Sequence, residues 1–397
     1  MSSRPPVKDW ATDFDHIDPR WIENPFPLWD ELRQRCPVAH SGRFEGGAYF
    51  PSRYQDVRDI AYDTEHFSSR RVVVRDKKLE QLLPSPPITS DPPEHRADRM
   101  PLLPPFNAKA VDKLTPGTQT LCARLIDRFI GEGRCDAATA YAQHIPTRVI
   151  AHMLGVPEDD GDRFRHWIKM ALEVGIYEPH KAMEAIKEMS VYFKDQMARR
   201  GTQRSDDLIS YVMDLQQDGK PVAEEKRIGA LRLILIAGID TTWSAIGASL
   251  WHLATHAEDR RRLVADPSLI DTAVEELLRA YAPVTMAREV VKEVTINGCP
   301  MKPGGMVLLS FPAANRDPEM FPDADKVLID RKENRHAAFG LGIHRCIGSN
   351  LARMELRVAL EEWLKRIPEF TLAEGEQVTW SEGTVRGPRR LPLVFGA

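Results

Sequence analysis

The chain has 397 residues, of which 42% are hydrophobic and 28% charged, and its formal net charge is −4. This composition is ordinary for a soluble globular protein, and the length is enough to bury a large core and enclose a sizeable ligand. The small negative charge argues against binding to nucleic acid or to an anionic membrane. The five cysteines are odd in number and widely spaced. They argue against a disulfide framework or a zinc site and for a reducing compartment.

The sequence shows no feature of a membrane or secreted protein. Its first residues, MSSRPPVKDW, are polar and contain no signal-peptide core. The longest apolar run, 233–239, is too short to span a bilayer. We therefore expect a cytoplasmic protein with no membrane contact. Since there is no repeat, low-complexity tract or linker, residues 1–397 are predicted to form a single domain.

The N-terminal part contains short elements. Apolar spacing predicts a helix over 25–35, a strand over 46–50 and a short helix over 54–61. The next stretch, 70–87, has no steady period and carries the basic residues Arg70, Arg71, Arg75, Lys77 and Lys78. A solvated charged loop is the simpler interpretation, and a site for a carboxylate-bearing substrate is the alternative.

A helix is predicted to begin at Asp91, with Asp91 as cap and Glu94 completing a capping box. His95 and Arg99 follow four residues apart, on one face of this helix. Two cationic donors so placed can hold carboxylates, whereas two solvent-exposed side chains are the plainer alternative. Pro101, Pro104 and Pro105 should end the helix early.

Helical patterns dominate from 115 to 222, including a pair of helices over 159–174 and 181–199 with a break around Tyr177. A long helix is then predicted from Glu224 to about Thr255. Gly238 and Thr241 lower the helix stability at its middle. Glycine within a helix costs about 1 kcal/mol of stability, and the threonine hydroxyl can donate a hydrogen bond to a backbone carbonyl one turn earlier. Such a site can open a groove for a diatomic ligand beside a cofactor. Asp240 and Thr241 form an acid–alcohol pair that can relay protons, and a solvated Asp beside a packed Thr is the alternative.

Two further motifs occupy the last third of the chain. Glu276 and Arg279 form a Glu-x-x-Arg pair on a predicted helix that ends near Tyr281. The segment 339–348, FGLGIHRCIG, places Cys346 among glycines just before a helical pattern over 349–366. Backbone N–H groups and a helix N-terminus favour a thiolate there. This is the chemistry of an axial thiolate ligand to haem iron, although a lone cysteine is more often a small buried hydrophobe.

The pattern Phe-x-x-Gly-x-His-x-Cys-x-Gly resembles the haem-binding signature of the cytochrome P450 family, in its soluble bacterial form. The acid–alcohol helix, the Glu-x-x-Arg helix and the Cys loop also occur in the family's order. The resemblance implies a mainly α fold with small β-sheets, with haem b between the long helix and the Cys346 loop. It identifies Cys346 as the iron ligand. It also implies haem contacts for five further residues, namely Phe339, Gly340, Gly348, Ala237 and Gly238.

The resemblance assigns roles to further side chains. Haem propionates would be bound by His95, Arg99, Arg288 and His344. Glu276 and Arg279 would join Arg331 in a buried structural network. Asp240 and Thr241 would be the catalytic pair. The substrate pocket would include Val284, Thr285, Ala287 and, more weakly indicated, Val385.

The implied reaction is monooxygenation, in which O2 is activated with two electrons to hydroxylate, dealkylate or epoxidise a small organic substrate. Since no flavin or iron–sulfur motif is present, electrons from NAD(P)H should arrive through separate proteins, a ferredoxin and its reductase. Arg345 and Arg353 are candidates for docking the donor to a protein that we expect to be a monomer. A peroxide-driven haem-thiolate enzyme and a non-catalytic haem binder remain alternatives. The sequence does not identify the substrate.

Overall fold

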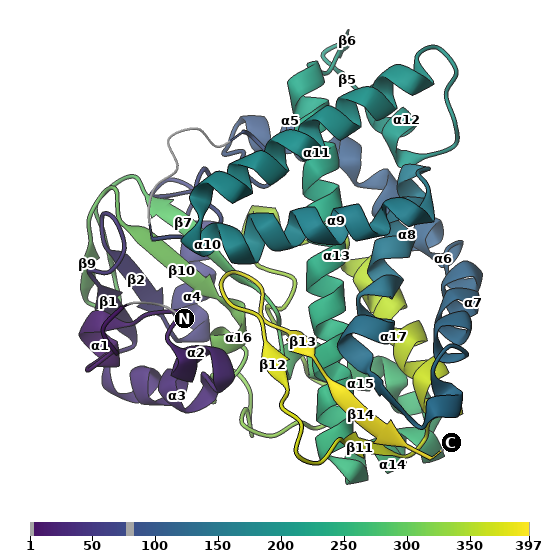
Figure 1. Ribbon diagram of the computed structural model, residues 1–397. Helices are drawn as coiled ribbons and strands as arrows, with labels where there is room; N and C mark the ends of the chain where they lie inside the picture. The colour runs from purple at the N-terminus through teal and green to yellow at the C-terminus, as the bar shows by residue number, and fades with distance from the viewer. Residues whose placement is uncertain (1–3, 77–82, 397) are drawn as a thin grey trace.

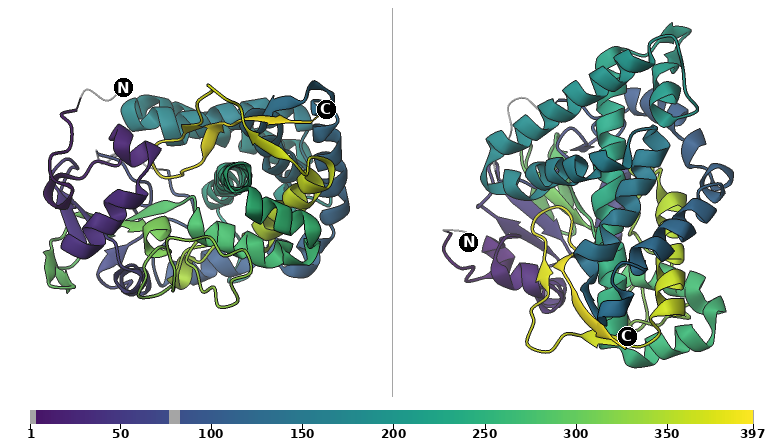
Figure 2. Two further views of the ribbon diagram at one scale, coloured as in Figure 1. Left: turned by 90° about the horizontal axis from the view of Figure 1, so that it is seen from below. Right: turned by 45° about the vertical axis from the view of Figure 1, so that its right-hand side comes forward.

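One long helix, α13 (Glu224–Thr255), organises the molecule. The computed structural model describes residues 4–76 and 83–396. Figure 1 shows α13 running through the centre, and Figure 2 shows it end-on with other helices and strands around it. The predicted bounds of this helix are confirmed. Lys77 and Lys78 lie outside the described residues.

α13 is apolar enough and long enough to cross a membrane by composition alone, but two-thirds of its most apolar window is buried inside the protein. A helix that is hydrophobic all round is expected in the core of a large protein. Helices α7 (Thr115–Ile126), α8 (His144–Leu154), α15 (Ile270–Ala280) and α17 (Ser349–Arg366) share one continuous hydrophobic core with it. α13 is therefore the core helix of the α-helical half.

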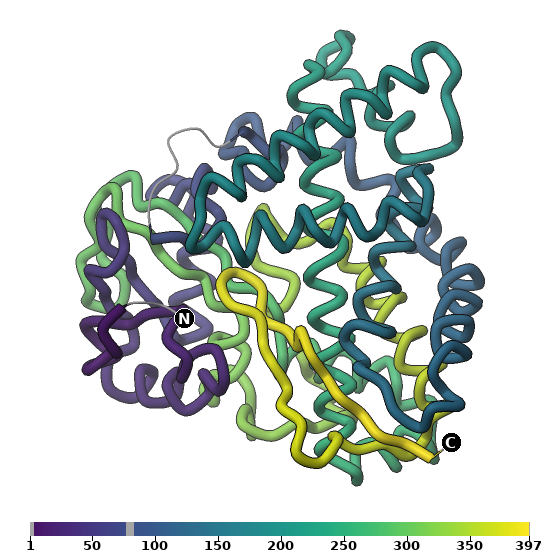
Figure 3. The backbone as a smooth tube through the Cα atoms, viewed as in Figure 1, coloured from purple at the N-terminus to yellow at the C-terminus, as the bar shows by residue number. Residues whose placement is uncertain are grey.

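A pair of helices covers one end of α13. α9 (Gly161–Lys169) continues through a π-helical turn, η6 (Met170–Val174), into the short α10 (Gly175–Tyr177), and α11 (Pro179–Arg200) returns across the molecule. Figure 3 shows this pair above the tip of the C-terminal hairpin. The predicted break near Tyr177 is confirmed.

The main sheet lies on the N-terminal side and has five strands in the order β1-β2-β10-β7-β3. β10 pairs with β2 in parallel and with β7 in antiparallel orientation. Short helices pack near it. The bounds are β1 (Val38–Ser41), β2 (Ala48–Pro51), β3 (Phe67–Ser68), β7 (Thr285–Val290), β10 (Met306–Ser310), α1 (Trp10–Asp13), α2 (Pro19–Glu23), α3 (Phe26–Arg35), α4 (Tyr54–Tyr62) and α16 (Phe311–Ala314).

The remaining sheets are small, so the predicted fold class, mainly α with small sheets, is confirmed. β4 (Arg134–Asp136), β14 (Pro392–Phe395) and β11 (Phe370–Leu372) form one sheet, and the described residues form three further, two-stranded sheets. The latter are β5 (Gln216–Gln217) with β6 (Lys220–Pro221), β8 (Val294–Ile296) with β9 (Cys299–Met301), and β12 (Thr379–Trp380) with β13 (Pro388–Arg390). Two further helices are α12 (Leu208–Met213) and α14 (Ala257–Ala265).

The prolines after Arg99 end the helix early, as predicted. α5 (Glu94–Arg99) passes into 3₁₀ turns at Met100–Leu102 and Pro104–Phe106, and a separate helix, α6 (Ala108–Asp112), follows. The prediction that Asp91 caps α5 is wrong. The Asp91 carboxylate binds the Ser68 hydroxyl and the Ser69 N–H instead of capping α5. Tertiary partners therefore take the place of the local capping box.

The predicted solvated loop after Arg70 is only partly correct. Arg70 is exposed, but Arg71 and Arg75 are both only 7% exposed. Arg75 donates to the carbonyl oxygens of Ala171 and Gly175, at 2.8 and 2.9 Å. The Arg75 guanidinium therefore fastens the loop to the η6–α10 turn. Two of its donor groups are used in this way and are not available to a substrate carboxylate.

Candidate active site

The Cys346 loop is held by backbone contacts. The Cys346 N–H donates to the Phe339 carbonyl oxygen at 2.7 Å, and the Gly340 N–H donates to the Ala337 carbonyl. Gly342 has φ +68°, and a Cβ there would lie 2.3 Å from the Ala61 carbonyl oxygen. Only glycine accepts both this conformation and this approach to α4. The loop is therefore fixed against α4 before α17 begins at Ser349.

As a residue Cys346 is exposed in this loop, although protein atoms surround its sulfur. Burial raises the pKa of its thiol, whereas the Gly348 N–H and the guanidinium groups of Arg99, Arg345 and Arg353 act to lower it. These positive groups favour the thiolate, and a coordinated metal deprotonates such a thiol outright. The donors that surround Cys346 therefore suit a sulfur that ligates a cation.

Four basic side chains from three segments gather near the loop. His95 and Arg99 come from α5, Arg288 from β7, and His344 from the 3₁₀ turn that precedes Cys346. The rings of His95 and His344 lie 4.3 Å apart. Arg99 donates to the Arg345 carbonyl, and the His344 Nε2 lies 2.8 Å from the Ser69 hydroxyl.

Among the described residues this basic group has counter-charges only at longer range, Asp91 near Arg288 and His95, and Asp98 near His95. Arg288 is 5% exposed, and no carboxylate in the described part of the chain lies within ion-pairing distance of it. Burial lowers the pKa of Arg288 to about 10. Burial, together with Arg288, His95 and Arg99, lowers the pKa of His344 to about 3. The Nε2 of His95 is buried without a partner. Buried cations are normally paired, so this set fits a ligand that carries carboxylates.

The middle of α13 has an accessible face. Ala237 is exposed although the helix around it is mostly buried, and Thr241 is partly exposed one turn later. The Thr241 hydroxyl donates to the Ala237 carbonyl oxygen at 2.7 Å, which is the back-bond predicted from the sequence. Gly238 does not face open space: a Cβ there would lie 2.5 Å from Ile150 of α8. The glycine is thus required by helix packing, and its contact with a cofactor stays a prediction.

Asp240 belongs to a buried ionic chain that the sequence did not reveal. It is 1% exposed, and its Oδ1 accepts from Arg389 of β13 at 2.7 Å. Arg389 also binds Glu173 of η6 at 2.5 Å and stacks on Trp243, 4.3 Å from the ring centre. Burial raises the pKa of Asp240 to about 6 against the opposing charge of Arg389. Its Oδ2 is buried without a partner. Such a carboxyl group can hold and release a proton near neutral pH.

The Glu-x-x-Arg network is as the resemblance implies. Glu276 and Arg279 are fully buried and joined by two hydrogen bonds of 2.8 and 2.9 Å. Arg331 donates to the same carboxylate at 2.9 Å, and Asn334 donates at 3.1 Å. Arg279 also binds the carbonyl oxygens of three loop residues, Asn315, Ala324 and Lys326. The network therefore fastens α15 to the irregular segment that leads into the Cys346 loop.

A second ionic contact, which the sequence did not indicate, joins α15 to α17. Arg353 binds Glu275 through two bonds of 2.6 and 2.8 Å, and it lies over the Phe339 ring at 4.4 Å. Burial would raise the pKa of Glu275, but Arg353 and His336 outweigh it and lower that pKa to about 2. Arg353 is therefore engaged within the molecule, and only Arg345 of the two predicted docking arginines is freely exposed.

The predicted pocket residues converge in part. Val284 and Val385 form an isolated antiparallel bridge, and the Thr285 N–H donates to the Thr384 carbonyl at 2.9 Å. Val284 and Thr285 are partly exposed, so they can line a pocket. Ala287 has no exposed surface, and its N–H donates to the Val72 carbonyl oxygen; Val385 is also buried, at 5% exposed.

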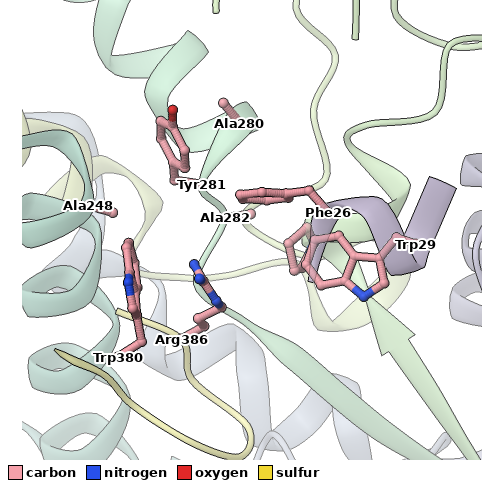
Figure 4. Close-up of a pocket in the computed structure, with 9 residues that line it drawn as sticks. Phe26, Trp29, Ala248, Ala280, Tyr281, Ala282, Trp380 and Arg386 are labelled. Atoms are coloured by element: carbon pink, nitrogen blue, oxygen red, sulfur yellow. The ribbon is translucent and has the colours of Figure 1, made fainter. Parts of the chain in front are cut away.

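A separate small cavity lies outside this site. It measures about 10 Å³, room for about one water molecule. Figure 4 shows it between α13, the end of α15 and the C-terminal hairpin. Arg386 lies against Trp380 there, 3.9 Å from the ring centre. None of its lining residues is a candidate site residue.

Comparison with known proteins agrees with this geometry. The cytochrome P450 family model matches residues 264–384. The chain is 35% identical over 377 residues to the mycinamicin IV hydroxylase/epoxidase of Micromonospora griseorubida, covering 92% of this chain and 94% of that protein. It is 33% identical over 384 residues to the vitamin D(3) 25-hydroxylase of Pseudonocardia autotrophica, covering 94% of each. The chain belongs to the cytochrome P450 family.

Solved structures of this family share the whole fold. The cytochrome P450 PksS of the Bacillus subtilis 168 bacillaene polyketide synthase superposes with a TM-score of 0.89 at 28% identity, covering 97% of this chain and 100% of that one. The cofactor is therefore haem b, and the protein is a cytochrome P450 monooxygenase that acts on a small organic substrate with O2. The thiolate and the unpaired basic group fit this cofactor.

Proposed function

We propose that this cytochrome P450 holds its haem through Cys346 and four basic side chains, and that Asp240 and Thr241 deliver the protons of the reaction. The observation that carries the proposal is the unpaired basic group beside an exposed cysteine. When bound, haem supplies an iron centre at which O2 is reduced and cleaved, with electron density from the thiolate favouring cleavage.

The chain's own residues orient that centre. Cys346 provides the sulfur ligand, and the Gly348 N–H limits the charge on it. His95, Arg99, Arg288 and His344 bind the two propionates by charge-assisted hydrogen bonds. The network of Glu276, Arg279 and Arg331 keeps the loop in position. Its value lies in fixed geometry, since a buried ion pair contributes little net stability.

The proton path would run through two adjacent residues of α13. The Asp240 carboxyl, with a pKa of about 6, exchanges protons at neutral pH. The Thr241 hydroxyl lies on the accessible face and can pass a proton onward once its bond to Ala237 is exchanged. Arg389 fixes the position of the acid. This acid–alcohol pair favours O2-driven catalysis over a purely peroxide-driven reaction.

Electrons would come from NAD(P)H through a ferredoxin and its reductase, because the sequence contains no flavin or iron–sulfur motif. The exposed Arg345 next to the ligand cysteine is available for the donor. We further propose that residues 1–397 act as one domain, as a cytoplasmic monomer. Sedimentation of the purified holoenzyme tests the monomer directly.

The substrate would be a mainly apolar organic molecule. Val284, Thr285 and Val385, which the structure brings together, would form part of its pocket. Relatives are named for mycinamicin IV and vitamin D(3), and a related solved structure is a complex with testosterone. These three compounds are the first probes for a substrate-induced spin-state shift in the haem spectrum.

The ligand assignment is tested by the spectrum of the reduced, CO-bound protein. Wild-type protein should show the red-shifted Soret band of a thiolate-ligated haem. Cys346→Ala should lose this band, whereas Cys135→Ala, a cysteine remote in sequence from the loop, should keep it. A band that persists in Cys346→Ala, or never forms in haem-loaded wild type, rejects the assignment.

The reaction type is tested by turnover with either of two oxidant supplies. Product with NAD(P)H, ferredoxin and reductase supports monooxygenation. Product with peroxide alone would favour the peroxide-driven alternative. Absence of turnover with every substrate that shifts the spin state would favour a non-catalytic haem binder.

A further inference from the structure

Five basic side chains gather on three helices that carry none of the candidate active-site residues. Arg124 lies in α7 and Arg128 just beyond its end, His144 and Arg148 lie one turn apart on α8, and Arg165 lies on α9. α8 packs against both α7 and α9, and Figure 1 shows α9 crossing in front of α13 toward α8, with α7 on the other side of α8. We call this set the α7–α9 cluster.

The cluster has more positive than negative charge. Glu158 contacts Arg124 at 3.4 Å and Arg148 at 3.7 Å, and Asp162 pairs with Arg165. These two carboxylates face four guanidinium groups. Two positive charges therefore remain without a matching carboxylate among the contacts of the described residues.

Two of the arginines are incompletely satisfied. Arg128 is exposed, and within residues 4–76 and 83–396 its side chain has no hydrogen bond or ion pair with the protein, so it is free to bind a ligand from solvent. Arg148 is 15% exposed in its side chain, and its Nη1 is buried without an acceptor. An unsatisfied buried donor costs about 1–3 kcal/mol. The cluster thus contains donors whose acceptor the protein itself does not provide.

The basic side chains are close enough to affect one another. Burial, followed by the charges of Arg165, Arg148 and Arg128, lowers the pKa of His144 to about 4. Burial lowers the pKa of Arg148; among its neighbours Glu158 acts to raise that pKa, while Arg128, Arg124 and Arg165 act to lower it. Like charges at this range destabilise the fold unless an anion lies between them.

We propose that the α7–α9 cluster binds a small multivalent oxyanion of the phosphate type. The uncompensated charge of two matches the charge of a phosphate group near neutral pH, about −1.5 to −2. Planar guanidinium groups from three helices present forked donors that suit tetrahedral oxyanions. The anion can be free phosphate or the headgroup of an acidic phospholipid, and both offer the same chemistry.

The test measures the melting temperature of the holoenzyme while chloride is replaced by inorganic phosphate at constant ionic strength. Binding to the native state should raise the wild-type melting temperature with the logarithm of phosphate concentration. Arg128→Gln should weaken phosphate binding about tenfold, because a charge-assisted bond is lost. Since the Arg128 side chain has no partner to lose, this variant should fold normally.

Arg148→Gln should weaken binding further, because this side chain lies between the other helices. Arg199→Gln is the matched control, since Arg199 is exposed on α11 and paired with Asp195. It should keep the full phosphate response. Equal responses in wild type and Arg128→Gln, or no response beyond that of chloride, would overturn the proposal.

A sedimentation arm identifies the source of the anion. Vesicles of phosphatidic acid in phosphatidylcholine should pellet wild type but not Arg128→Gln if the ligand is a lipid headgroup. If wild type responds to inorganic phosphate and stays in the supernatant, the ligand is a free phosphate compound. Both results require the phosphate response described above and therefore support the site.

Discussion

The Asp240 carboxyl group is subject to two opposing influences. Burial raises its pKa to about 6, while the Arg389 guanidinium at 2.7 Å acts to lower it. Glu173, which shares the same guanidinium, adds a like charge that raises it again. The protonation of one side chain on α13 is therefore set by β13 and by the turn η6, which are remote from it in sequence.

Replacing Arg389 tests this balance. In Arg389→Gln the lowering influence is lost, so Asp240 should stay protonated to higher pH. In a plot of kcat against pH, the limb that reports the ionisation of Asp240 should shift to higher pH by about one unit or more. The measurement is coupled product formation against pH, with haem content held equal. Arg389→Lys retains the charge and should keep the wild-type limb. An unmoved limb in Arg389→Gln would show that Asp240 is not the titrating group.

Thr241 offers a second test at this scale. Its hydroxyl makes one bond to the Ala237 carbonyl, which continues to accept within the helix, so Thr241→Ala should fold and bind haem. It should divert electrons, so that peroxide formed per NAD(P)H consumed rises several-fold while product falls. Thr241→Ser keeps a hydroxyl and should remain largely coupled. Unchanged coupling in Thr241→Ala would remove the relay role.

At the scale of elements, features set by local sequence patterns could be predicted, whereas features set by partners distant in sequence could not. The bounds of α13, α17 and the break near Tyr177 follow from periodicity and helix breakers, which are local signals. The failure of Asp91 to cap α5 depends on Ser68 and Ser69, which are more than 20 residues away. A capping motif in the sequence cannot show that its carboxylate has a better partner elsewhere.

The candidate site shows the same division. Cys346, His95 and the Glu276–Arg279 pair could be found because each lies in a motif with fixed spacing. Arg389 could not, since it meets Asp240 across 149 residues and lies in an undistinguished stretch of the tail. The signal for Arg389 in the sequence was Asp240 itself, because an Asp that becomes buried requires a basic partner.

The element that depends most on a buried ionic network is α15. Glu276 has no exposed surface and accepts bonds from Arg279, Arg331 and Asn334. Glu276→Gln leaves two guanidinium groups without their counter-charge, which should cost about 3–5 kcal/mol. We expect a lower melting temperature and faster haem loss, whereas the exposed Glu374→Gln should change neither. Normal haem retention in Glu276→Gln would contradict the role of this network in holding the Cys346 loop.

Across the whole molecule, buried arginines join segments that are distant in sequence. Arg33 donates to the Ala313 carbonyl, Arg75 to those of Ala171 and Gly175, and Arg260 to those of Leu253 and Phe370. Carbonyl oxygens are the acceptors of the Arg75 guanidinium, whereas Arg33 and Arg260 also pair with the carboxylates of Asp30 and Glu369. The sheet, the turn between α9 and α11, and the helical core are thereby connected around α13.

One buried acid has no such partner, and the stability of the whole fold should depend on it. Glu355 of α17 has no exposed surface, and neither carboxyl oxygen has a hydrogen-bond partner. Burial raises its pKa well above the ordinary value of 4.5. The group is therefore protonated in the folded protein but ionises in the unfolded chain as soon as pH exceeds about 4.5.

Because the folded pKa is raised, the associated stability is complete below pH 4.5 and is lost as pH rises toward the folded pKa. This one group should remove about 1.4 kcal/mol per pH unit over that range. Glu355→Gln cannot ionise, so its melting temperature should exceed that of wild type by a margin that widens from pH 5 to pH 8. Glu374→Gln, a change at an exposed position, should give no widening margin. A difference between Glu355→Gln and wild type that stays constant with pH would mean that Glu355 is ionised in the folded protein.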